Sequence, residues 1–324
     1  MKDDSLEPIF TALITHVGWW HSLIVRFCHE SSIDKVVSAF NSLAVPNLIH
    51  FGAYLQENDH ELFITLAFTQ FIFTGCTSCL SFFECVDVSM ECFWPPLGAV
   101  TNLRLLVSPS AWLLTGDHFK DLLMSASAVE RLQIRGNIVN PDDQVDLSSV
   151  SLPHLLQLRI GLCWDQSCID PCYFEVSCPA LTTIMLGTMI IESTEAFVNC
   201  LLDAAVQPKY LALTTLEFKF ANCIELDEDF ITVLLTITHL SFTSCNYVDH
   251  VLDLIIECYD NAWPRLHTLT ISSFRSKWIQ PLWDFVAQRI DMGLPLKCVK
   301  LSEVEGDVWG DNTFLRDHVL LEVN

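Results

Sequence analysis

Cysteine is the residue type of this chain with the greatest capacity for metal or redox chemistry. The chain has 14 cysteines; Cys76 and Cys79 form a C-x-x-C pair, and four more lie at 163, 168, 172 and 178. A structural zinc site requires two close cysteine or histidine pairs on tight turns. Cys168 and Cys172 fit such a pair only loosely, and no neighbouring pair completes the site. Since cysteine is commonly a small buried apolar residue, we predict no metal, no cofactor and mostly reduced, buried thiols.

Residues suited to catalysis are present, but they form no known catalytic pattern. None of the 11 histidines belongs to an H-E-x-x-H motif, and there is no G-x-S-x-G, Walker A or G-x-G-x-x-G sequence. The acidic cluster at 227–229 is typical of a helix start, where the helix dipole favours carboxylates. We therefore predict that the chain is not an enzyme.

The charge of the chain restricts its binding partners. It carries 40 Asp+Glu against 17 Lys+Arg, a formal net charge of −23 over 324 residues. Such a chain repels phosphate backbones, which argues against nucleic acid as a partner. The first eight residues, MKDDSLEP, lack the basic and apolar regions of a secretory signal, so we expect a cytoplasmic or nuclear location.

One apolar motif recurs along the chain, and the elements that it forms must position the cysteine, histidine and charged side chains. The pattern φ-x-x-φ-x-φ, in which φ is apolar, ends at 25, 53, 105, 134, 160, 186, 218, 242, 271 and 301. From 105 onward the steps are 24 to 32 residues long, and a degenerate copy at TSCLSFFE is placed on Cys79 and Phe82. Spacing of this size is typical of a solenoid with one repeat per step. The Leu-x-x-Leu-x-Leu form is the leucine-rich-repeat pattern, in which an Asn or Cys follows three residues later, here Asn137, Cys163 and Cys245.

Helical patterns lie between the motifs. They cover 117–126, where Asp117 is the expected N-cap, and 193–205, 227–237, 249–263 and 279–293, where Gly293 is the expected stop. Strand followed by helix in repeated order predicts the α/β class. We expect about ten or eleven units in a leucine-rich-repeat solenoid, with a curved parallel sheet on the concave side and helices on the convex side. The predicted organisation is a helical leader at 1–18 and one irregular repeat domain at 19–324.

One uncharged stretch at 62–83 is long enough to cross a bilayer. Its several Thr, Ser and Gln residues, and flanks at Glu61 and Glu84 without Lys or Arg, are unlike a membrane span. We interpret it as part of the solenoid core and expect no membrane association.

The layout resembles the repeat region of fungal F-box-like leucine-rich-repeat proteins. The segments that carry the resemblance are WWHSLIV (19–25), VPNLIHFGAYL (45–55), PPLGAVTNLRLL (95–106), SAVERLQIRG (127–136), SLPHLLQLRI (151–160) and WPRLHTLTI (263–271). The resemblance implies a substrate receptor of a cullin-based ubiquitin ligase, whose F-box binds the ligase adaptor while the repeats hold the substrate. The first repeat of this chain begins by residue 20, which leaves no room for an F-box before it. Binding of the ligase adaptor is therefore expected only if an F-box is encoded upstream.

Outward positions of the motif are the candidate partner-binding residues, because side chains alternate along a strand. They are Arg104, Arg131, Gln133, Arg135, Gln157, Arg159, Glu217, Lys219, His239, Thr268, Thr270 and Lys300. Arginines on three successive strands suit an acidic partner, since arginine binds carboxylates bidentately. A solvated surface balanced by nearby acids is the default interpretation of the same residues. The sequence thus predicts protein recognition through the concave face, with an uncoupled scaffold or a small-ligand sensor as alternatives.

Overall fold

The computed structural model describes residues 6–28, 32–55, 70–88, 93–107, 114–136, 138–139, 143, 146–161, 175–187, 201, 209–219, 231, 233–246, 248–258, 263–304 and 313–323. The chain divides into two compact units, Met1–Leu155 and Leu156–Asn324, called unit 1 and unit 2. The expected division into a leader at 1–18 and a repeat domain at 19–324 stays a prediction, although a helix, α1 (Leu6–Ile14), lies within the leader.

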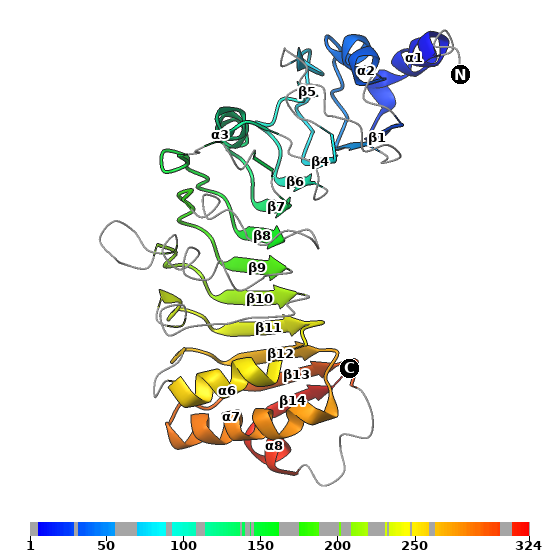
Figure 1. Ribbon diagram of the computed structural model, residues 1–324. Coiled ribbons are helices and arrows are strands. Elements are labelled where there is room, and N and C mark those ends of the chain that lie inside the picture. Colours follow the sequence, from blue (N-terminus) through cyan, green and yellow to red (C-terminus); the bar gives the residue numbers. More distant parts are fainter. Residues whose placement is uncertain are drawn as a thin grey trace. The chain divides into compact units, whose positions relative to one another are not determined.

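Unit 1 is built on five parallel strands in the order β1-β2-β4-β6-β7 (Figure 1). They are β1 (Ser22–Phe27), β2 (His50–Leu55), β4 (Phe82–Val86), β6 (Asn102–Leu106) and β7 (Arg131–Arg135). The strands are joined through α2 (Ile33–Phe40), through a small sheet of β3 (Gln70–Phe71) and β5 (Phe93–Trp94), and through α3 (Gly116–Ser125). A short helix, η2 (Val17–Trp19), precedes β1.

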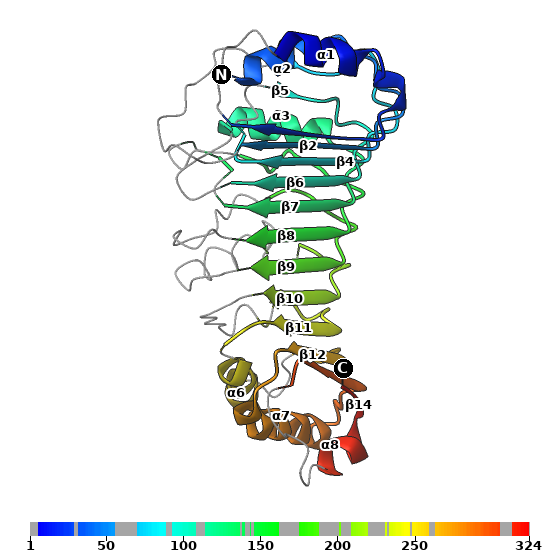
Figure 2. The ribbon, with the colours of Figure 1, turned by 90° about the vertical axis from the view of Figure 1, so that its right-hand side faces the viewer.

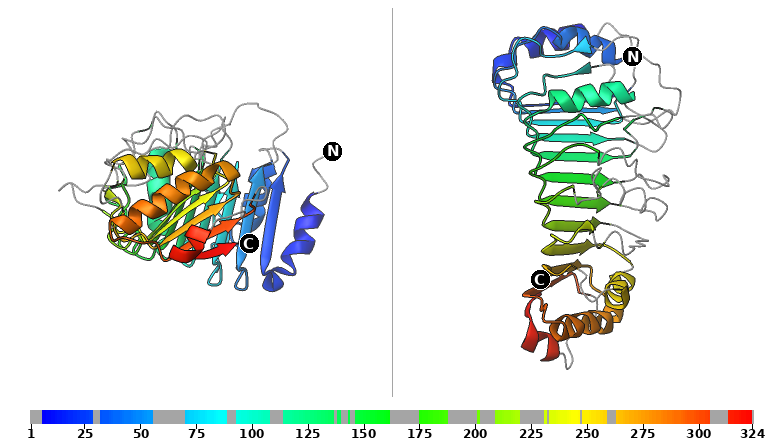
Figure 3. Two further views of the ribbon diagram at one scale, coloured as in Figure 1. Left: turned by 90° about the horizontal axis from the view of Figure 1, so that it is seen from below. Right: turned by 90° about the vertical axis from the view of Figure 1, so that its left-hand side faces the viewer.

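Unit 2 has the same pattern, with seven parallel strands in chain order, and the arrows of its green strands point the same way in Figure 2. They are β8 (Gln157–Gly161), β9 (Thr183–Gly187), β10 (Thr215–Lys219), β11 (His239–Thr243), β12 (Thr268–Ser272), β13 (Cys298–Ser302) and β14 (Leu320–Val323). Three helices, α6 (Val248–Cys258), α7 (Ile279–Asp291) and α8 (Thr313–His318), and the short η6 (Ser276–Trp278) connect the last strands. Figure 3 shows α6 and α7 side by side over one face of this sheet.

Strand formation follows from the motif. In β6 the burial alternates, with Leu103 and Leu105 fully buried and Arg104 between them partly exposed. The same alternation recurs on β4 and on β7 to β12. Burying each such side chain contributes about 1.5–3 kcal/mol, so a one-residue shift of any strand would expose its whole apolar set. The ten φ-x-x-φ-x-φ copies therefore mark ten of the twelve strands of the large sheet.

The same backbone features recur before and after the strands: a hydrogen-bonded turn before them and a residue with positive φ after them. Before β10 the amide of Leu213 donates to the carbonyl of Tyr210 (3.1 Å), and before β12 that of Leu266 donates to Trp263 (2.9 Å). After the strands, residues with positive φ recur two positions beyond the last inward residue: Asp87, Gly136, Ser244, Ser273 and Glu303. A left-handed residue reverses the chain direction and so ends the strand at a fixed point.

Aromatic rings fill much of the core of unit 1. The ring of Phe51 stacks on that of Phe83 with centroids 5.7 Å apart, and Phe40 stacks on Phe73 at the same distance. Unit 2 has an equivalent pair, Phe218 and Phe242, at 5.6 Å. Offset and edge-to-face ring contacts add to the free energy of burial.

The structure corrects the sequence predictions at three places. The inward residues of the degenerate repeat are Leu80, Phe83 and Cys85, which are buried, whereas Cys79 is exposed and Phe82 lies on the outward side of β4. Two adjacent apolar residues, Phe82 and Phe83, allowed either register. The N-cap of α3 is Thr115, whose hydroxyl accepts a bond from the amide of His118, and not Asp117. A twelfth strand, β14, was not predicted.

Two predicted helices are confirmed, and other predicted features fall on residues that the structure does not describe. Helices α6 and α7 match the patterns at 249–263 and 279–293, and Gly293 has a positive φ at the end of α7. Cys245, at the Asn or Cys position of the repeat pattern, donates its thiol to the backbone carbonyls of Phe218 (3.4 Å) and Thr243 (3.5 Å). All of the pattern at 193–205 except position 201, the first part of the pattern at 227–237, and Asn137 and Cys163 lie outside the described residues. Within the described part of the chain, no helix is long and apolar enough to cross a membrane.

The architecture is an α/β leucine-rich-repeat solenoid, in which parallel strands present apolar side chains to the helices and turns on one side. The opposite side of each sheet, to which the outward residues of the motif point, is called the open face below.

Candidate partner-binding face

All twelve candidate residues lie on the open face. Strand register places Arg104 next to Gln133, with Arg131 and Arg135 at the two ends of β7. The other eight belong to unit 2, and each reaches solvent: Gln157, Arg159, Glu217, Lys219, His239, Thr268, Thr270 and Lys300. A role of these residues in binding a partner stays a prediction.

Three rows of side chains cross the open face of unit 1. The register of the five strands sets the rows as Ser22, His50, Phe82, Asn102 and Arg131; Ile24, Gly52, Glu84, Arg104 and Gln133; and Arg26, Tyr54, Val86, Leu106 and Arg135. The candidate residues predicted from the sequence include none on the first three strands of this face, so Tyr54 and Glu84 were not among them. Counting outward from the motif Leu48/Phe51/Ala53 gives His50, Gly52 and Tyr54, so that signal was available for β2.

A hydrogen-bonded and ionic network occupies the middle of this face. The hydroxyl of Tyr54 donates to Oε2 of Glu84, and Nη1 of Arg104 lies 3.6 Å from Oε1 of the same carboxylate. Burial, followed by the carboxylate of Glu84, raises the pKa of Tyr54 to about 12. Glu84 is the better shielded partner of the ion pair, with 13% of its side chain exposed against 42% for Arg104. Glu84 is therefore engaged from two neighbouring strands at once.

Aromatic rings surround the network. The guanidinium carbon of Arg104 lies 5.0 Å from the ring centroid of Phe82, and the His50 ring meets the same ring edge-to-face at 4.6 Å. The guanidinium of Arg26 lies 5.8 Å from the Tyr54 ring. Cation–π contacts at such partly exposed sites contribute about 0.5–1 kcal/mol each and hold the guanidinium groups over the rings.

Gly52 makes room for this arrangement. A Cβ atom at position 52 would lie 2.9 Å from Cε2 of Tyr54 and 3.6 Å from Nε2 of His50. The side chains of His50 and Tyr54 therefore both extend over Gly52, one from each side along β2. Because that space is free of a side chain, the Tyr54 ring can cross it toward Glu84.

The open face of unit 2 carries charges of both signs among neutral side chains. The row through its middle holds Arg159, Met185, Glu217, Ser241, Thr270, Lys300 and Glu322. Its charges are partly paired: Nζ of Lys300 lies 2.8 Å from Glu322, and the hydroxyl of Thr243 donates to Glu217 at 3.5 Å. The Lys300–Glu322 contact raises the pKa of Lys300 and lowers that of Glu322. This surface can therefore form hydrogen bonds with a partner but carries no strong electrostatic potential of one sign.

The cysteines of the described residues form no metal site. In that part of the chain, no group of three or more His, Cys, Asp and Glu side chains is placed to hold a metal ion. Seven described cysteines are free thiols; Cys85, Cys178, Cys245 and Cys298 are buried, and Cys28, Cys76 and Cys79 are exposed. Cys168 and Cys172 lie outside the described residues.

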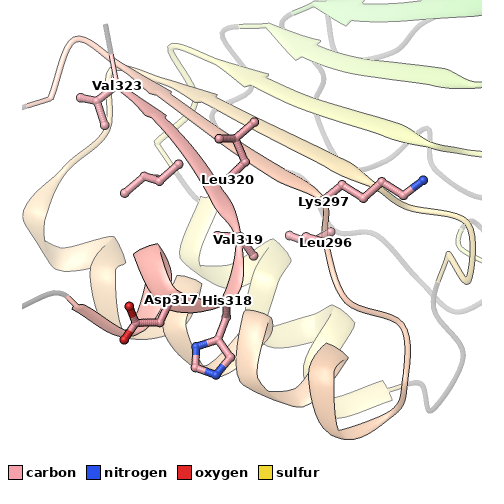
Figure 4. Close-up of a pocket in the computed structure, with 8 residues that line it drawn as sticks. Leu296, Lys297, Asp317, His318, Val319, Leu320 and Val323 are labelled. Carbon is pink, nitrogen blue, oxygen red and sulfur yellow. The ribbon is translucent and has the colours of Figure 1, made fainter.

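A cavity of about 950 Å³ lies beside the last strand of unit 2, β14 (Figure 4). It is lined by Leu296, Lys297, Asp317, His318, Val319, Leu320, Leu321 and Val323. Leu320 and Val323 are 61% and 44% exposed, so β14 is a poorly covered edge of the sheet. The cavity is a feature of this edge rather than a hollow over the open face.

No family model matches the chain, and no curated protein matches it. Among solved structures, the chain is similar to human 5T4 (Wnt-activated inhibitory factor 1, trophoblast glycoprotein), with 19% sequence identity and a TM-score of 0.36 over 64% of this chain and 70% of that one. At this level of similarity the comparison adds no argument about function.

Proposed function

We propose that this chain recognises protein partners through the open face of its leucine-rich-repeat sheet. One observation carries the proposal. Along the strands the inward residues are buried, whereas the outward residues reach solvent and include arginine, tyrosine, histidine and threonine side chains. Tyrosine and arginine, together with tryptophan, are enriched among the residues that contribute most to the binding energy of protein interfaces. A rigid sheet that displays them in fixed rows suits an extended partner surface.

The resemblance to F-box-like proteins supplies a more specific proposal. In it, the open face holds a substrate for a cullin-based ubiquitin ligase, and an adaptor binds through an F-box encoded upstream. A repeat scaffold without ligase coupling is the alternative within the same class. The small-ligand alternative finds less support, because the large cavity described above lies at the β14 edge and not over the open face.

The test is affinity purification of the full chain, with the bound proteins identified by mass spectrometry. An open-face variant, Arg159→Glu with His239→Glu, changes two exposed residues of unit 2. Its matched control, Arg265→Glu with His154→Glu, changes the same residue types at exposed positions in turns before strands. We expect the open-face variant to lose partners that the control retains.

Two results decide the question. Equal partner recovery with both variants and with a variant of the unit 1 open face, Arg131→Glu with Arg135→Glu, would contradict recognition through this face. A cullin and its adaptor among the recovered proteins would support the ligase proposal. Recovery of other face-dependent partners without them would favour the scaffold.

A further inference from the structure

We propose that the open face of unit 1 binds an acidic protein segment, with Arg131 and Arg135 binding its carboxylates. The inference rests on the proposed function and names the partner class for this part of the face. It replaces the default interpretation of these arginines as a solvated surface balanced by nearby acids.

The charge of the face supports an acidic partner. Residues 1–155 contain four arginines, at 26, 104, 131 and 135, and all four lie in the outward rows of unit 1. Those rows contain a single acidic residue, Glu84, although the whole chain carries a net charge of −23. Arginines therefore outnumber carboxylates in these rows, whereas acidic residues outnumber basic ones in the chain as a whole.

The one acid of the face does not neutralise the arginines of β7. Glu84 already accepts a hydrogen bond from Tyr54 and pairs with Arg104. Arg131 and Arg135 are exposed, and neither forms an ion pair with any residue that the structure describes. They are therefore free to bind a carboxylate from another molecule.

The spacing of the guanidinium groups suits an extended segment. Arg131 and Arg135 are four residues apart on one strand, which separates their Cα atoms by about 13 Å, with Arg104 on the next strand about 4.8 Å away. An extended peptide aligned with β7 places the side chains of residues i and i+4 on one side at the same separation of about 13 Å. Gln133 lies between the two arginines and can bond the peptide backbone.

The choice of arginine and of aromatic neighbours favours a protein over other anions. Arginine binds a carboxylate with two parallel hydrogen bonds, and the outward rows of unit 1 contain no lysine. Phe82 and Tyr54 add apolar contact area beside the charges. A long polyanion would also meet the acidic remainder of the chain, whereas a short segment feels mainly the charges within about 10 Å.

The experiment uses the full chain and two fluorescent peptides. One carries glutamate at positions i and i+4 in a Thr- and Ser-rich sequence; the other carries glutamine at both positions. Fluorescence anisotropy measures binding at low and at physiological salt. We expect the Glu peptide to bind at least about tenfold more tightly than the Gln peptide, and less tightly as salt rises.

Matched variants assign the binding to the face. Arg131→Gln with Arg135→Gln is expected to weaken Glu-peptide binding about tenfold or more. The control, Arg265→Gln with Lys297→Gln, removes the same charge from exposed positions outside the open face and should bind as the unaltered chain does. In a charge-reversed variant, Arg131→Glu with Arg135→Glu, a peptide with lysine at i and i+4 should bind instead. Thermal unfolding by circular dichroism confirms that each variant is folded.

Three results would overturn the inference: equal binding of the Glu and Gln peptides, an equal loss in the control variant, or tighter arginine-dependent binding of duplex DNA or phosphatidylserine vesicles than of the Glu peptide. If the peptide test fails while partner recovery still depends on open-face residues, only this inference falls. If partner recovery is also independent of the face, the proposed function falls with it.

Discussion

The hydroxyl of Tyr54 on β2 donates a hydrogen bond to the carboxylate of Glu84 on β4, 30 residues further along the chain. Arg104, on the next strand, binds the other oxygen of that carboxylate. Three consecutive strands of unit 1 are thus joined on their open face by side chains as well as by backbone. This cross-strand link fixes the middle of the face that we propose binds partners.

Ionisation of Tyr54 should be delayed relative to a free phenol. Its pKa is raised from 10.0 to about 12, mainly by burial and then by Glu84, so the folded chain keeps this proton longer than the unfolded chain does. The stabilisation is therefore complete below pH 10 and is lost as the pH rises toward 12. The difference in ultraviolet absorbance between the unaltered chain and Tyr54→Phe during alkaline titration should give a late phase that belongs to Tyr54. A difference curve with its midpoint near pH 10 would contradict the assignment.

Substitution of Gly52 should disturb the network without touching a charge. In Gly52→Ala the new Cβ atom displaces the Tyr54 ring, which lies 2.9 Å away, and the hydrogen bond to Glu84 is lost at a cost of about 1 kcal/mol. The late tyrosine phase should then move toward pH 10. Gly98→Ala is the control, because nothing lies within 4 Å of its Cβ position. Equal effects of the two substitutions would contradict the close approach of Tyr54 to Gly52.

Unequal effects at Phe82 and Phe83 should test the register of β4. Phe83 is fully buried and stacks on Phe51, so Phe83→Ala should lower the free energy of unfolding by about 3–5 kcal/mol. Phe82 lies partly exposed on the open face, and Phe82→Ala should cost clearly less. Urea denaturation of both variants measures the difference. The reverse order would restore the register based on Cys79 and Phe82.

Removal of the buried guanidinium of Arg289 should destabilise unit 2. This α7 side chain is 3% exposed, and its Nη2 donates to the carbonyls of Trp263 and Leu266, each at 3.3 Å. Its burial lowers the pKa of the guanidinium to about 10. Arg289→Met should cost about 1–3 kcal/mol, because carbonyls of the turn before β12 lose their donor. Thermal or urea unfolding should show little change for Arg265→Met, an exposed residue of the same turn.

Thiol reactivity should separate the described cysteines. Hydrogen bonds from the backbone and side chain of Ser78 lower the pKa of the exposed Cys76, whereas burial raises that of Cys178 to about 12. Since the thiolate is the reactive form, iodoacetamide at pH 8 should alkylate Cys76 early and Cys178 only after unfolding. Mass spectrometry of peptides taken over time gives both rates. Comparable rates in the folded chain would contradict the buried position of Cys178.

Much of the fold follows from short-range pattern. In Leu103–Arg104–Leu105 the alternation of apolar and polar residues alone indicates which side chain points inward. It fails where the pattern is ambiguous: Phe82 and Phe83 are both apolar, and only packing of Phe83 on Phe51 selects the register. Strand β14 was missed because its residues are poorly buried and are ordered mainly by pairing with β13.

The sequence by itself determined the repeat and the direction of most strand side chains, and therefore which residues belong to the open face. Both follow from patterns that can be read along the chain: side chains alternate within a strand, and from residue 105 onward the strand motif recurs every 24 to 32 residues. Only the tertiary structure decided which outward residues are neighbours. Glu84 could have paired with any of the arginines, and strand register brings it to Arg104 and Tyr54. Pairing across strands depends on distances between residues far apart in the chain, and it is this pairing that leaves Arg131 and Arg135 exposed and without a described ion-pair partner.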